Sequence, residues 1–475
     1  MKYAALVQIQ LYKVFLILIK FYVGLVLTYP SSSFNTKISS IPYHNYYSGV
    51  KVKSEGKNFY STLACTDLES ENFIRWFVGF SDGESNFTIV FQKDKNGNIT
   101  GASFRFIIEL HLDDINTLKY IKSKLNIGNN ISEYGNSCKF TVIHKKDIEK
   151  LISIFDKYNL NTTKYLDYLD FKKAFQLYNE NITKNKKIFM DKLVEIKNGM
   201  NANRKDFTYP SDHKIVISSY WLLGLIEGEG SFYLDRHKFQ PSFILTLTEV
   251  QYPVIEKIKE FLVNNLGFDM YSIFKLKNSS VITIIEEKSR NNSKALVKLK
   301  ITNTNVIVNY FIPFLNTMYF ITKKGLDFND FKIISHAIYN GGHRNKEVKD
   351  CILTLSYTMN NYRLSTNSES VKVLELPEGL LDKIINATKT IVHLSDGRQV
   401  DIITKKEINI RWTNCVYEII QNNGEIKLAS TLNNAGLILD VDFRTVRRYL
   451  NCLSREGYFT TIKDSKIRRV AVFYN

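Results

Sequence analysis

The sequence predicts a mixed α/β protein built from two copies of one unit, followed by a smaller C-terminal region. The first observation is an internal repeat, in which WFVGFSDGE at 76–84 returns as WLLGLIEGE at 221–229. The second is that later segments of the two copies match in the same order. The third is the length of 475 residues, which suggests about three modules at roughly 150 residues per domain.

The match between the copies extends well beyond these two motifs. FIIEL at 106–110 corresponds to FILTL at 243–247, and an amphipathic pattern follows each of them. This order is typical of a strand followed by a helix. KYLDYLDF at 164–171 corresponds to KGLDFNDF at 324–331. Each copy therefore predicts helix, strands, helix, strands and helix, with the helices on one face of an antiparallel sheet.

The spacing between matching residues changes along the chain. Glu229 follows Glu84 by 145 residues, Phe243 follows Phe106 by 137, and Lys324 follows Lys164 by 160. The second copy should therefore have a hairpin 8 residues shorter and 23 extra residues later. We expect the extra residues between Lys277 and Lys298, where little regular pattern predicts a surface loop.

The chain divides into four parts on this basis. They are an apolar leader and linker (1–61), the first copy (70–200), the second copy (213–360) and a C-terminal region (361–475). The apolar run VFLILIKFYVGLVLT at 14–28 contains Lys20 and is shorter than the roughly 20 residues that span a bilayer. It is compatible with a weak membrane or signal segment, a targeting segment, or leader sequence from an upstream reading frame.

Composition narrows the class of partner. The chain has 64 basic and 47 acidic residues, a net charge of +17, and this excess favours a polyanion, nucleic acid first. With 44% hydrophobic and 23% charged residues it is neither disordered nor fibrous in type. Its 5 cysteines are scattered without a C-x-x-C pair, which indicates a reducing compartment and neither a disulfide framework nor a zinc knuckle.

Each motif carries two glycines four residues apart, Gly79 and Gly83 in the first copy and Gly224 and Gly228 in the second. Glycine inside a helix lowers its stability by about 0.5–1 kcal/mol relative to alanine. A glycine pair that occurs in both copies therefore indicates a structural requirement. Close approach of two helix backbones supplies one. We expect the two motif helices to pack at their glycines and to bring the acids that end them together.

Paired carboxylates at such a junction have a defined chemistry. Glu84 and Glu229 would lie close to each other and to the negative ends of two helices, which makes ionisation of both costly without a cation. Oxygen ligands of this kind bind Mg²⁺. A site of this composition is suited to metal-assisted hydrolysis of a phosphodiester.

Both motifs resemble those of the LAGLIDADG homing endonucleases, in the single-chain, two-motif form encoded in organellar introns. The likeness covers roughly residues 71–360 and includes the paired Lys-x-x-Asp-aromatic segments at 164–168 and 324–328. It implies two pseudo-symmetric αββαββα halves that form a saddle over double-stranded DNA, a long non-palindromic target, a monomer and a mitochondrial location. It also favours the upstream-reading-frame interpretation of the apolar run at 14–28.

The resemblance implies a role for each matched residue. The catalytic residues would be Glu84, Glu229, Lys164 and Lys324, and the ligands of Mg²⁺ (or Mn²⁺) would be the two glutamates with the carbonyls of Gly83 and Gly228. The lysines would polarise the hydrolytic water, and Lys323 competes with its neighbour if the alignment slips by one. Asp82 and Glu227 are expected to serve helix ends rather than metal.

Polar residues on the predicted strands are candidate DNA contacts, with an ordinary solvated strand face as the alternative. They are Lys93, Lys95, Asn98 and Arg105 in the first copy, and Tyr233, Arg236, Lys238 and Gln240 in the second.

A helical pair at 432–439 and 443–450 predicts a helix-turn-helix within 430–452. Asp442 is a candidate N-cap, Val446 and either Tyr449 or Leu450 would face inward, and three arginines would stay outside. These candidate DNA contacts are Arg444, Arg447 and Arg448. A plain helical hairpin with solvated arginines is the alternative.

The resulting expectation is a site-specific double-strand DNA endonuclease of the intron-homing type. The main alternative is an RNA maturase that binds group I intron RNA and assists its splicing, since the same basic saddle could bind RNA. A non-catalytic DNA-binding protein is a third possibility, although it leaves the paired acids unexplained.

Overall fold

The computed structural model describes residues 70–180, 186–268, 281–289, 293–366, 376–393, 399–406, 408, 415–451 and 459–471. Helices in these ranges are all too short or too polar to cross a membrane. The apolar run at 14–28 and the linker up to residue 61 lie outside the described residues.

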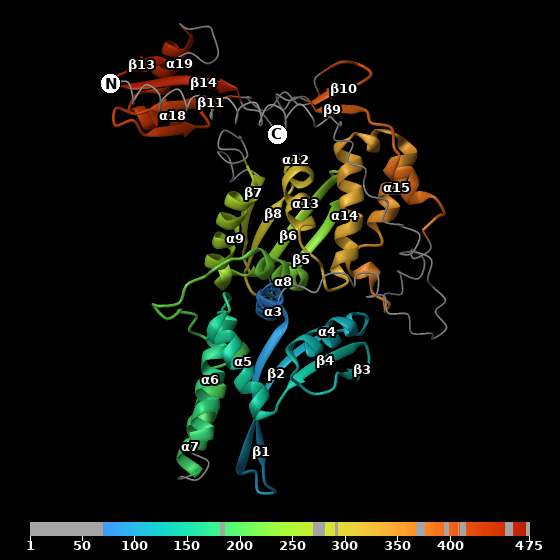
Figure 1. Cartoon of the computed structure of the whole chain (residues 1–475), viewed down its shortest axis with the longest axis vertical. Helices are drawn as coiled ribbons and strands as arrows, with labels where there is room; N and C mark the ends of the chain where they lie inside the picture. Colours follow the sequence, from blue (N-terminus) through green and yellow to red (C-terminus); the bar gives the residue numbers. More distant parts are fainter. Residues whose placement is uncertain are drawn as a thin grey trace, which may run out of the picture. The chain divides into compact units, whose positions relative to one another are not determined.

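The first half contains a four-stranded antiparallel sheet of order β1-β2-β4-β3 (Figure 1). Its elements are α3 (Ser70–Glu84), β1 (Ser85–Lys93), β2 (Ile99–His111), η2 (Leu112–Asp114), α4 (Ile115–Leu125), β3 (Ser132–Tyr134), β4 (Ser137–Val142), α5 (Lys145–Lys157), α6 (Lys164–Glu180), α7 (Lys186–Asn198) and η3 (Asn201–Asn203). Buried and accessible residues alternate along β4, because one face of the sheet packs on the core.

The second half repeats this arrangement with a sheet of order β5-β6-β8-β7. Its elements are α8 (Ser219–Glu229), β5 (Gly230–Asp235), β6 (Gln240–Thr248), η4 (Glu249–Gln251), α9 (Tyr252–Asn265), β7 (Ile282–Glu287), β8 (Leu296–Ile301), α12 (Thr304–Val306), the π-helical η5 (Ile307–Phe311), α13 (Ile312–Asn316) and α14 (Lys324–Tyr339). The predicted duplication of a mixed α/β unit is therefore confirmed.

Strand register agrees with the repeat. Phe87 pairs with Phe106 in the first sheet, and Phe232 pairs with Phe243 in the second. These rings face the helices: Phe87 lies 5.3 Å from Phe171 of α6, and Phe232 lies 5.3 Å from Phe331 of α14, between ring centroids. The aromatic core thus attaches each helix that begins with the predicted lysine to the strand that follows the predicted acid.

One expectation about loops was right and another was wrong. The first hairpin is longer, since β1 has 9 residues and β5 has 6, as the offsets predicted. The segment between Lys277 and Lys298 is not all loop, because β7 lies within it and pairs with β8. The β-branched run around Ile282 forms a strand when its side chain is buried opposite Ile301, and this pairing is not visible in the local pattern. Residues 269–280 and 290–292 lie outside the described residues.

The chain after α14 first continues against the second half. This part consists of η6 (Gly342–Arg344), α15 (Lys346–Ser356), η7 (Asn360–Arg363), α17 (Leu380–Ile385), β9 (Ile391–His393) and β10 (Gln399–Asp401). α17 packs on α14 and α15, and the backbone N–H of Thr390 donates to the carbonyl of Asn340 at 3.0 Å.

A last module has its own small core. It contains β11 (Cys415–Ile420), β12 (Ile426–Ala429), α18 (Leu432–Leu439), α19 (Phe443–Asn451), β13 (Thr460–Ile462) and β14 (Ser465–Ala471). The strands form a sheet of order β12-β11-β14-β13, and α18 and α19 pack on each other and on it. The described part of the C-terminal region is therefore α+β with a helical pair, as expected.

Candidate active site

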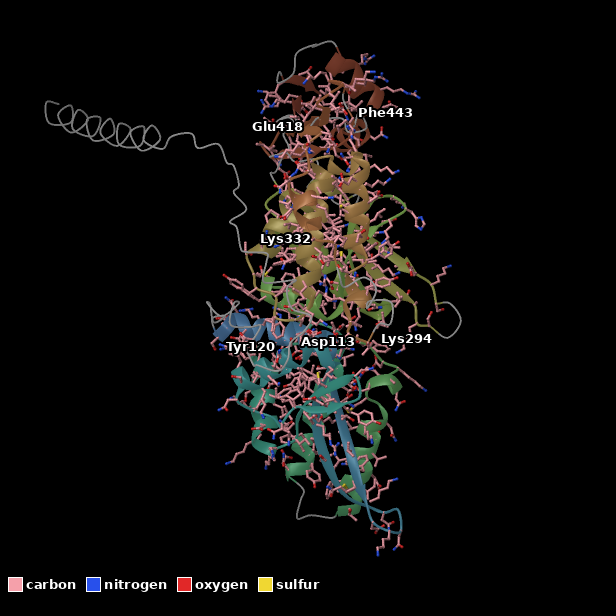
Figure 2. The ribbon with its side chains drawn as sticks, turned by 90° about the vertical axis from the view of Figure 1, so that its right-hand side faces the viewer. Asp113, Tyr120, Lys294, Lys332, Glu418 and Phe443 are labelled. Atoms are coloured by element: carbon pink, nitrogen blue, oxygen red, sulfur yellow. The ribbon has the colours of Figure 1, made fainter. Side chains whose placement is uncertain are left out.

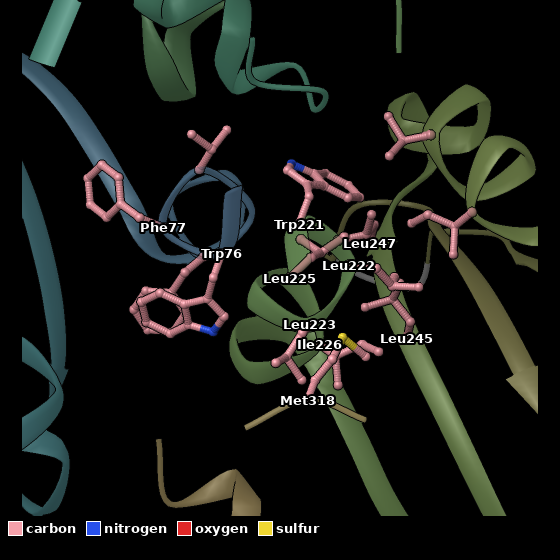
Figure 3. Packing of buried hydrophobic residues seen from close by; sticks show 14 of the residues in the cluster. Trp76, Phe77, Trp221, Leu222, Leu223, Leu225, Ile226, Leu245, Leu247 and Met318 are labelled. Carbon is pink, nitrogen blue, oxygen red and sulfur yellow. The ribbon is translucent and has the colours of Figure 1, made fainter. Parts of the chain in front are cut away.

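Helices α3 and α8 pack directly against each other at their first glycines (Figure 3). A Cβ atom on Gly79 would lie 1.9 Å from the carbonyl oxygen of Trp221, and one on Gly224 would lie 2.1 Å from the carbonyl oxygen of Trp76. No side chain fits at such distances without moving a backbone. The predicted glycine-to-glycine packing of the two motif helices is confirmed.

Each tryptophan of this helix pair is bonded to an acid of the other half. Trp76 Nε1 donates to Glu227 Oε1 at 2.8 Å, and Trp221 Nε1 donates to Asp82 Oδ2 at 2.8 Å. All four side chains are buried, and Trp76 and Trp221 lie apart, on different sides of the helix junction in Figure 3. The two halves are therefore joined by a reciprocal pair of buried hydrogen bonds.

The same two acids also receive backbone N–H groups at the starts of the lysine helices. Asp82 accepts from Asn161 and Thr162, both at 2.9 Å, just before α6. Glu227 accepts from residues 321 and 322 at 3.0 and 2.5 Å, just before α14. Burial raises the pKa of Asp82 and raises that of Glu227 to about 7, and the donated hydrogen bonds oppose the rise. Both acids thus serve helix ends, as expected.

The acids that end the two motifs meet at one end of the helix pair. A Cβ atom on Gly83 would lie 3.3 Å from Cγ of Glu229, and one on Gly228 would lie 3.3 Å from Cγ of Glu84. Desolvation raises the pKa of both glutamates, and the charge of Glu229 raises that of Glu84 further. The two carboxylates therefore lie close together where the halves meet and favour a positive charge nearby.

Lys164, the first residue of α6, reaches the end of the first motif. Its Nζ donates to the carbonyl of Gly83 at 3.2 Å and to the carbonyl of Ser85. Burial lowers the pKa of Lys164, while the charges of Asp82, Glu229 and Glu84 raise it. The ammonium group of Lys164 therefore contacts the backbone carbonyls of the residues immediately before and after Glu84.

Lys324 does the same in the second half. Its Nζ lies 3.5 Å from the carbonyl of Gly228 and 2.5 Å from that of Gly230. The neighbouring Lys323 points elsewhere and forms an ion pair with Asp113 at 2.5 Å (Asp113 is labelled in Figure 2). Of the two candidate lysines, the geometry therefore places Lys324 at the motif.

A cavity lies beside each acid. The cavity at Glu84 measures 410 Å³ and is lined by Lys324, while the cavity at Glu229 measures 480 Å³ and is lined by Lys164. Each acid thus shares its cavity with the lysine of the opposite half. Sequence comparison could not find this exchange, because it depends on how the two helices cross.

The two cavities differ at an equivalent position. In the first, Asp114 Oδ1 accepts from the backbone N–H of Lys323 at 2.9 Å. In the second, Gln251 accepts from the N–H of Thr163 at 3.0 Å and donates to its hydroxyl at 2.5 Å. A carboxyl group whose pKa is raised by burial therefore corresponds, in the other cavity, to an amide that does not titrate.

The donor atoms at this centre suit a hard divalent cation. Carboxylate and carbonyl oxygens are the ligands that Mg²⁺ prefers, and Mg²⁺ keeps several waters in its shell. The described residues contain no group of three or more His, Cys, Asp and Glu side chains placed to hold a metal. Two glutamates with the carbonyls of Gly83 and Gly228 therefore fit a cation that keeps much of its water.

The structure also contains a repeated contact that the sequence analysis missed. MNANR at 200–204 and MNNYR at 359–363 fold back in the same way on α6 and α14. We call the pair Asn201 and Arg204, and the pair Asn360 and Arg363, the two Asn–Arg clasps. Their shared M-N-x-x-R pattern could have been found by extending the repeat search.

The predicted DNA contacts fall into two groups. Arg105 and Tyr233 lie on the strand face away from the helices, while Lys93, Lys95 and Lys238 are exposed at the hairpins. Asn98 is also exposed, but its side chain donates to Asp94 at 3.2 Å.

Two of the predicted contacts use their polar groups inside the protein. Arg236 donates to the hydroxyl and the carbonyl of Ser356 at 3.0 and 2.9 Å and lies over the ring of Tyr357. Gln240 donates to the carbonyl of Thr302 at 2.8 Å. Both hold the second half together in this structure.

Three lysines on the same accessible strand faces were missed. They are Lys139 on β4 and Lys298 and Lys300 on β8, which alternate with buried apolar residues. The alternation in LVKLKI at 296–301 was the available signal.

In the C-terminal module, Val446 and Leu450 are buried and Tyr449 is 41% exposed, which settles the alternative between the last two. Asp442 Oδ1 accepts from the N–H of Arg444 at 2.7 Å at the start of α19, whose first residue, Phe443, is labelled in Figure 2. The three arginines are exposed. The predicted helical pair and its exposed basic face are therefore present.

Comparisons with known proteins agree with this geometry. The family model for the LAGLIDADG endonuclease matches residues 77–175 and 222–335. An uncharacterized mitochondrial protein of Saccharomyces cerevisiae is 23% identical over 407 residues, which is 82% of this chain and 79% of that protein. A probable intron-encoded endonuclease of Schizosaccharomyces pombe is 36% identical over 219 residues, 45% of this chain and 54% of its own length.

Solved structures share the fold of the two halves. The LAGLIDADG homing endonuclease I-GzeII in complex with its DNA target has a TM-score of 0.50 at 24% identity, over 61% of this chain and 99% of that one. The meganuclease I-SmaMI bound to DNA has a TM-score of 0.51 at 23% identity, over 62% of this chain and 98% of that one.

The duplicated fold and the paired acidic centre define a class of site-specific DNA endonucleases that carry both halves in one chain. Residues 77–175 and 222–335 of this chain belong to the LAGLIDADG endonuclease family. The matches do not favour the RNA maturase alternative, since the relatives that carry a functional name are called probable intron-encoded endonucleases.

Proposed function

We propose that this endonuclease cuts both strands of a long, non-palindromic DNA target, with Glu84 and Glu229 as its catalytic acids. The observation that carries the proposal is the meeting of these two carboxylates at the end of the glycine-packed helix pair. One chain supplies both acids and both lysines, so a monomer suffices. Since the two halves differ in sequence, the two half-sites of the DNA should differ as well.

The proposed cofactor is Mg²⁺ (or Mn²⁺), held by Glu84 and Glu229 with the carbonyls of Gly83 and Gly228. When bound, the ion would supply polarisation of the phosphate, activation of a water and stabilisation of the leaving oxygen. The fold holds the two carboxylates close together before any cation binds. Burial at this position raises the pKa of both carboxyl groups.

Lys164 and Lys324 would orient the attacking water in the two cavities. Each Nζ lies at the backbone carbonyls of its own motif and faces the acid of the other half. A lysine at that position can donate a hydrogen bond to a water or to a phosphate oxygen. Each centre would thus be built from the acid of one half and the lysine of the other.

The accessible strand faces are the proposed DNA surface. We assign phosphate or base contacts to Lys93, Lys95, Arg105, Lys139, Tyr233, Lys238, Lys298 and Lys300. A net charge of +17 supports binding to a polyanion. Asn98, Arg236 and Gln240 are left out, because their side chains donate hydrogen bonds within the protein. Lys139 and Lys298 form ion pairs with Glu109 and Glu287, which DNA phosphates would have to replace.

The C-terminal module is proposed as an additional DNA contact. Arg444, Arg447 and Arg448 are exposed on α19, the second helix of the pair, which is the helix that enters the major groove in helix-turn-helix proteins. Loss of all three charges should weaken DNA binding and leave the rate of cutting of bound DNA unchanged.

The relatives that are named as mitochondrial or intron-encoded support a mitochondrial protein of the intron-homing type. The natural substrate would then be the allele that lacks the intron.

A cleavage assay tests the catalytic proposal. Glu84→Gln and Glu229→Gln should each abolish double-strand cutting of the intronless allele in Mg²⁺ and retain DNA binding in Ca²⁺. Glu149→Gln, at an exposed position of α5, is the matched control and should cut normally. Full cutting by either active-site variant would overturn the proposal.

A further inference from the structure

We propose that Arg204 and Arg363 are positioning residues, each of which holds the lysine of its own half in place for the cutting of one DNA strand. The inference rests on the proposed roles of Lys164 and Lys324 and adds the residues that fix them. Its basis is the two Asn–Arg clasps, which occur at equivalent places in both halves.

The first clasp binds the beginning of α6. Arg204 Nε donates to Asp167 Oδ1 at 2.9 Å, and its Nη2 donates to Asp170 Oδ2 at 2.5 Å. The backbone N–H of Asn201 donates to the same Asp167 oxygen at 2.8 Å. These two aspartates lie three and six residues after Lys164, so the clasp grips the first two turns of the helix that Lys164 begins.

The second clasp repeats these contacts on α14. Arg363 Nε donates to Asp327 Oδ1 at 2.8 Å, and its Nη2 donates to Asp330 Oδ2. The N–H of Asn360 donates to Asp327 Oδ1 at 3.0 Å. The aspartates again lie three and six residues after the lysine, here Lys324.

Each clasp also binds the strand that follows the motif acid. Asn201 Nδ2 donates to the carbonyl of Phe87 on β1, and Asn360 Nδ2 donates to the carbonyl of Phe232 on β5, both at 2.9 Å. Both asparagines have a positive φ, 56° and 58°, which turns the amide toward the strand. The clasp thus connects the lysine helix to the strand three residues beyond the acid.

The arginines of the clasps and the first aspartate that each one binds are largely shielded from solvent, while Asp170 is 32% exposed. The arginine side chains are each 11% exposed, and the first aspartate of each pair is 14% or 8% exposed. Two carboxylates on one helix face would repel each other without the guanidinium between them, and Arg suits this position because its planar fork binds both. Loss of the arginine should let the start of the helix, and hence the lysine, shift.

The effect should be specific to one strand. The hydrogen bonds of each clasp bind only the lysine helix and the strand of the same half. A purely stabilising role would lower the folded fraction and slow both cuts equally. A positioning role slows the cut that uses the lysine of that half.

The test uses the full-length protein and a target duplex labelled on either strand, with single-turnover nicking rates measured in Mg²⁺. Arg204→Met should slow one strand by at least about tenfold relative to the other, compared with the wild-type ratio, and Arg363→Met should shift the ratio the opposite way. Arg75→Met, which removes a surface arginine paired with Glu71, is the matched control and should leave the ratio unchanged. An equal loss on both strands, or the same strand slowed by both variants, would overturn the inference.

Milder variants keep the test valid if the arginine variants unfold. Asn201→Gly and Asn360→Gly keep the positive φ without strain and remove the bond to the strand carbonyl. They should shift the strand ratio in the same direction as the arginine variant of their own half, with Ca²⁺-supported DNA binding retained. An unchanged ratio in both would contradict the inference.

Lysine variants separate this inference from the proposed function. Lys164→Met should slow the same strand as Arg204→Met, and Lys324→Met the same strand as Arg363→Met. Lysine variants that cut both strands at the wild-type rate would refute the proposed lysine role itself. Lysine variants that are slow on the strand opposite to that of their arginine would leave the lysine role intact and refute the clasp.

Discussion

Trp76 of the first half donates its indole N–H to Glu227 of the second half at 2.8 Å, and Trp221 returns the same bond to Asp82. The two acids also bind the backbone just before the lysine helices. Asp82 therefore connects the motif helix of the second half to the lysine helix of the first half, and Glu227 makes the converse connection. The distance between acids and lysines therefore depends on this buried network.

Removing one indole N–H should weaken the junction. Trp76→Phe is expected to lower the free energy of unfolding by about 1–3 kcal/mol, because Glu227 loses a donor while it stays buried. Chemical denaturation measures the change. Tyr134→Phe, at a position 85% exposed, is the control and should change stability by less than about 0.5 kcal/mol. Equal stability of the Trp76 variant and the wild type would contradict the buried bond.

Adding a methyl group at the helix contact should be more damaging. Gly79→Ala would place Cβ 1.9 Å from a backbone oxygen of Trp221, so the helices must separate, at a cost of about 3 kcal/mol or more. Thermal unfolding and cleavage should both be affected, since separation also moves the two acids apart. Gly199→Ala is the control, because its nearest neighbour would be 3.5 Å away. A Gly79 variant as stable as this control would rule out the close packing.

Cleavage should depend on pH through the paired glutamates. Desolvation raises the pKa of Glu84 and Glu229 above the ordinary value of 4.5, and the protonated form cannot hold a cation. The rate of cutting should therefore fall as the pH is lowered, with a midpoint above 4.5, and more Mg²⁺ should move that midpoint down. Single-turnover rates measure this, with DNA binding followed at each pH. At limiting Mg²⁺, a midpoint at or below 4.5 would contradict the desolvated, paired position of the two glutamates.

Charges on the strand faces should contribute to binding rather than to cutting. Arg105→Ala and Lys300→Ala should each weaken DNA binding and reduce the slope of log affinity against log salt by about 1 if each contacts one phosphate. Lys146→Ala, on the exposed face of α5, is the control, because α5 covers the opposite side of the sheet. If the salt dependence of DNA binding were unchanged in the strand variants, the strand faces would not be the DNA-binding surface.

The duplication, the motif acids, the glycine pairs and the start of each lysine helix could all be predicted from the amino-acid sequence. These features are local: a repeat with fixed spacing and a 3.6- or 2-residue period can be recognised without knowing what packs against it. The same locality explains the correct hairpin lengths and the helical pair at 432–450. It also explains the error at β7, whose strand depends on pairing with β8.

Which side chains come into contact could be seen only once the helices and strands were packed together. Helix crossing sets each acid beside the lysine of the other half, and a bond to Ser356 occupies Arg236, which local pattern had assigned to DNA. The clasps depend on a chain segment that returns about 40 residues after each lysine and neutralises two aspartates of the lysine helix. Such contacts join residues that are far apart in the chain, and their geometry is fixed by packing, which no local period encodes.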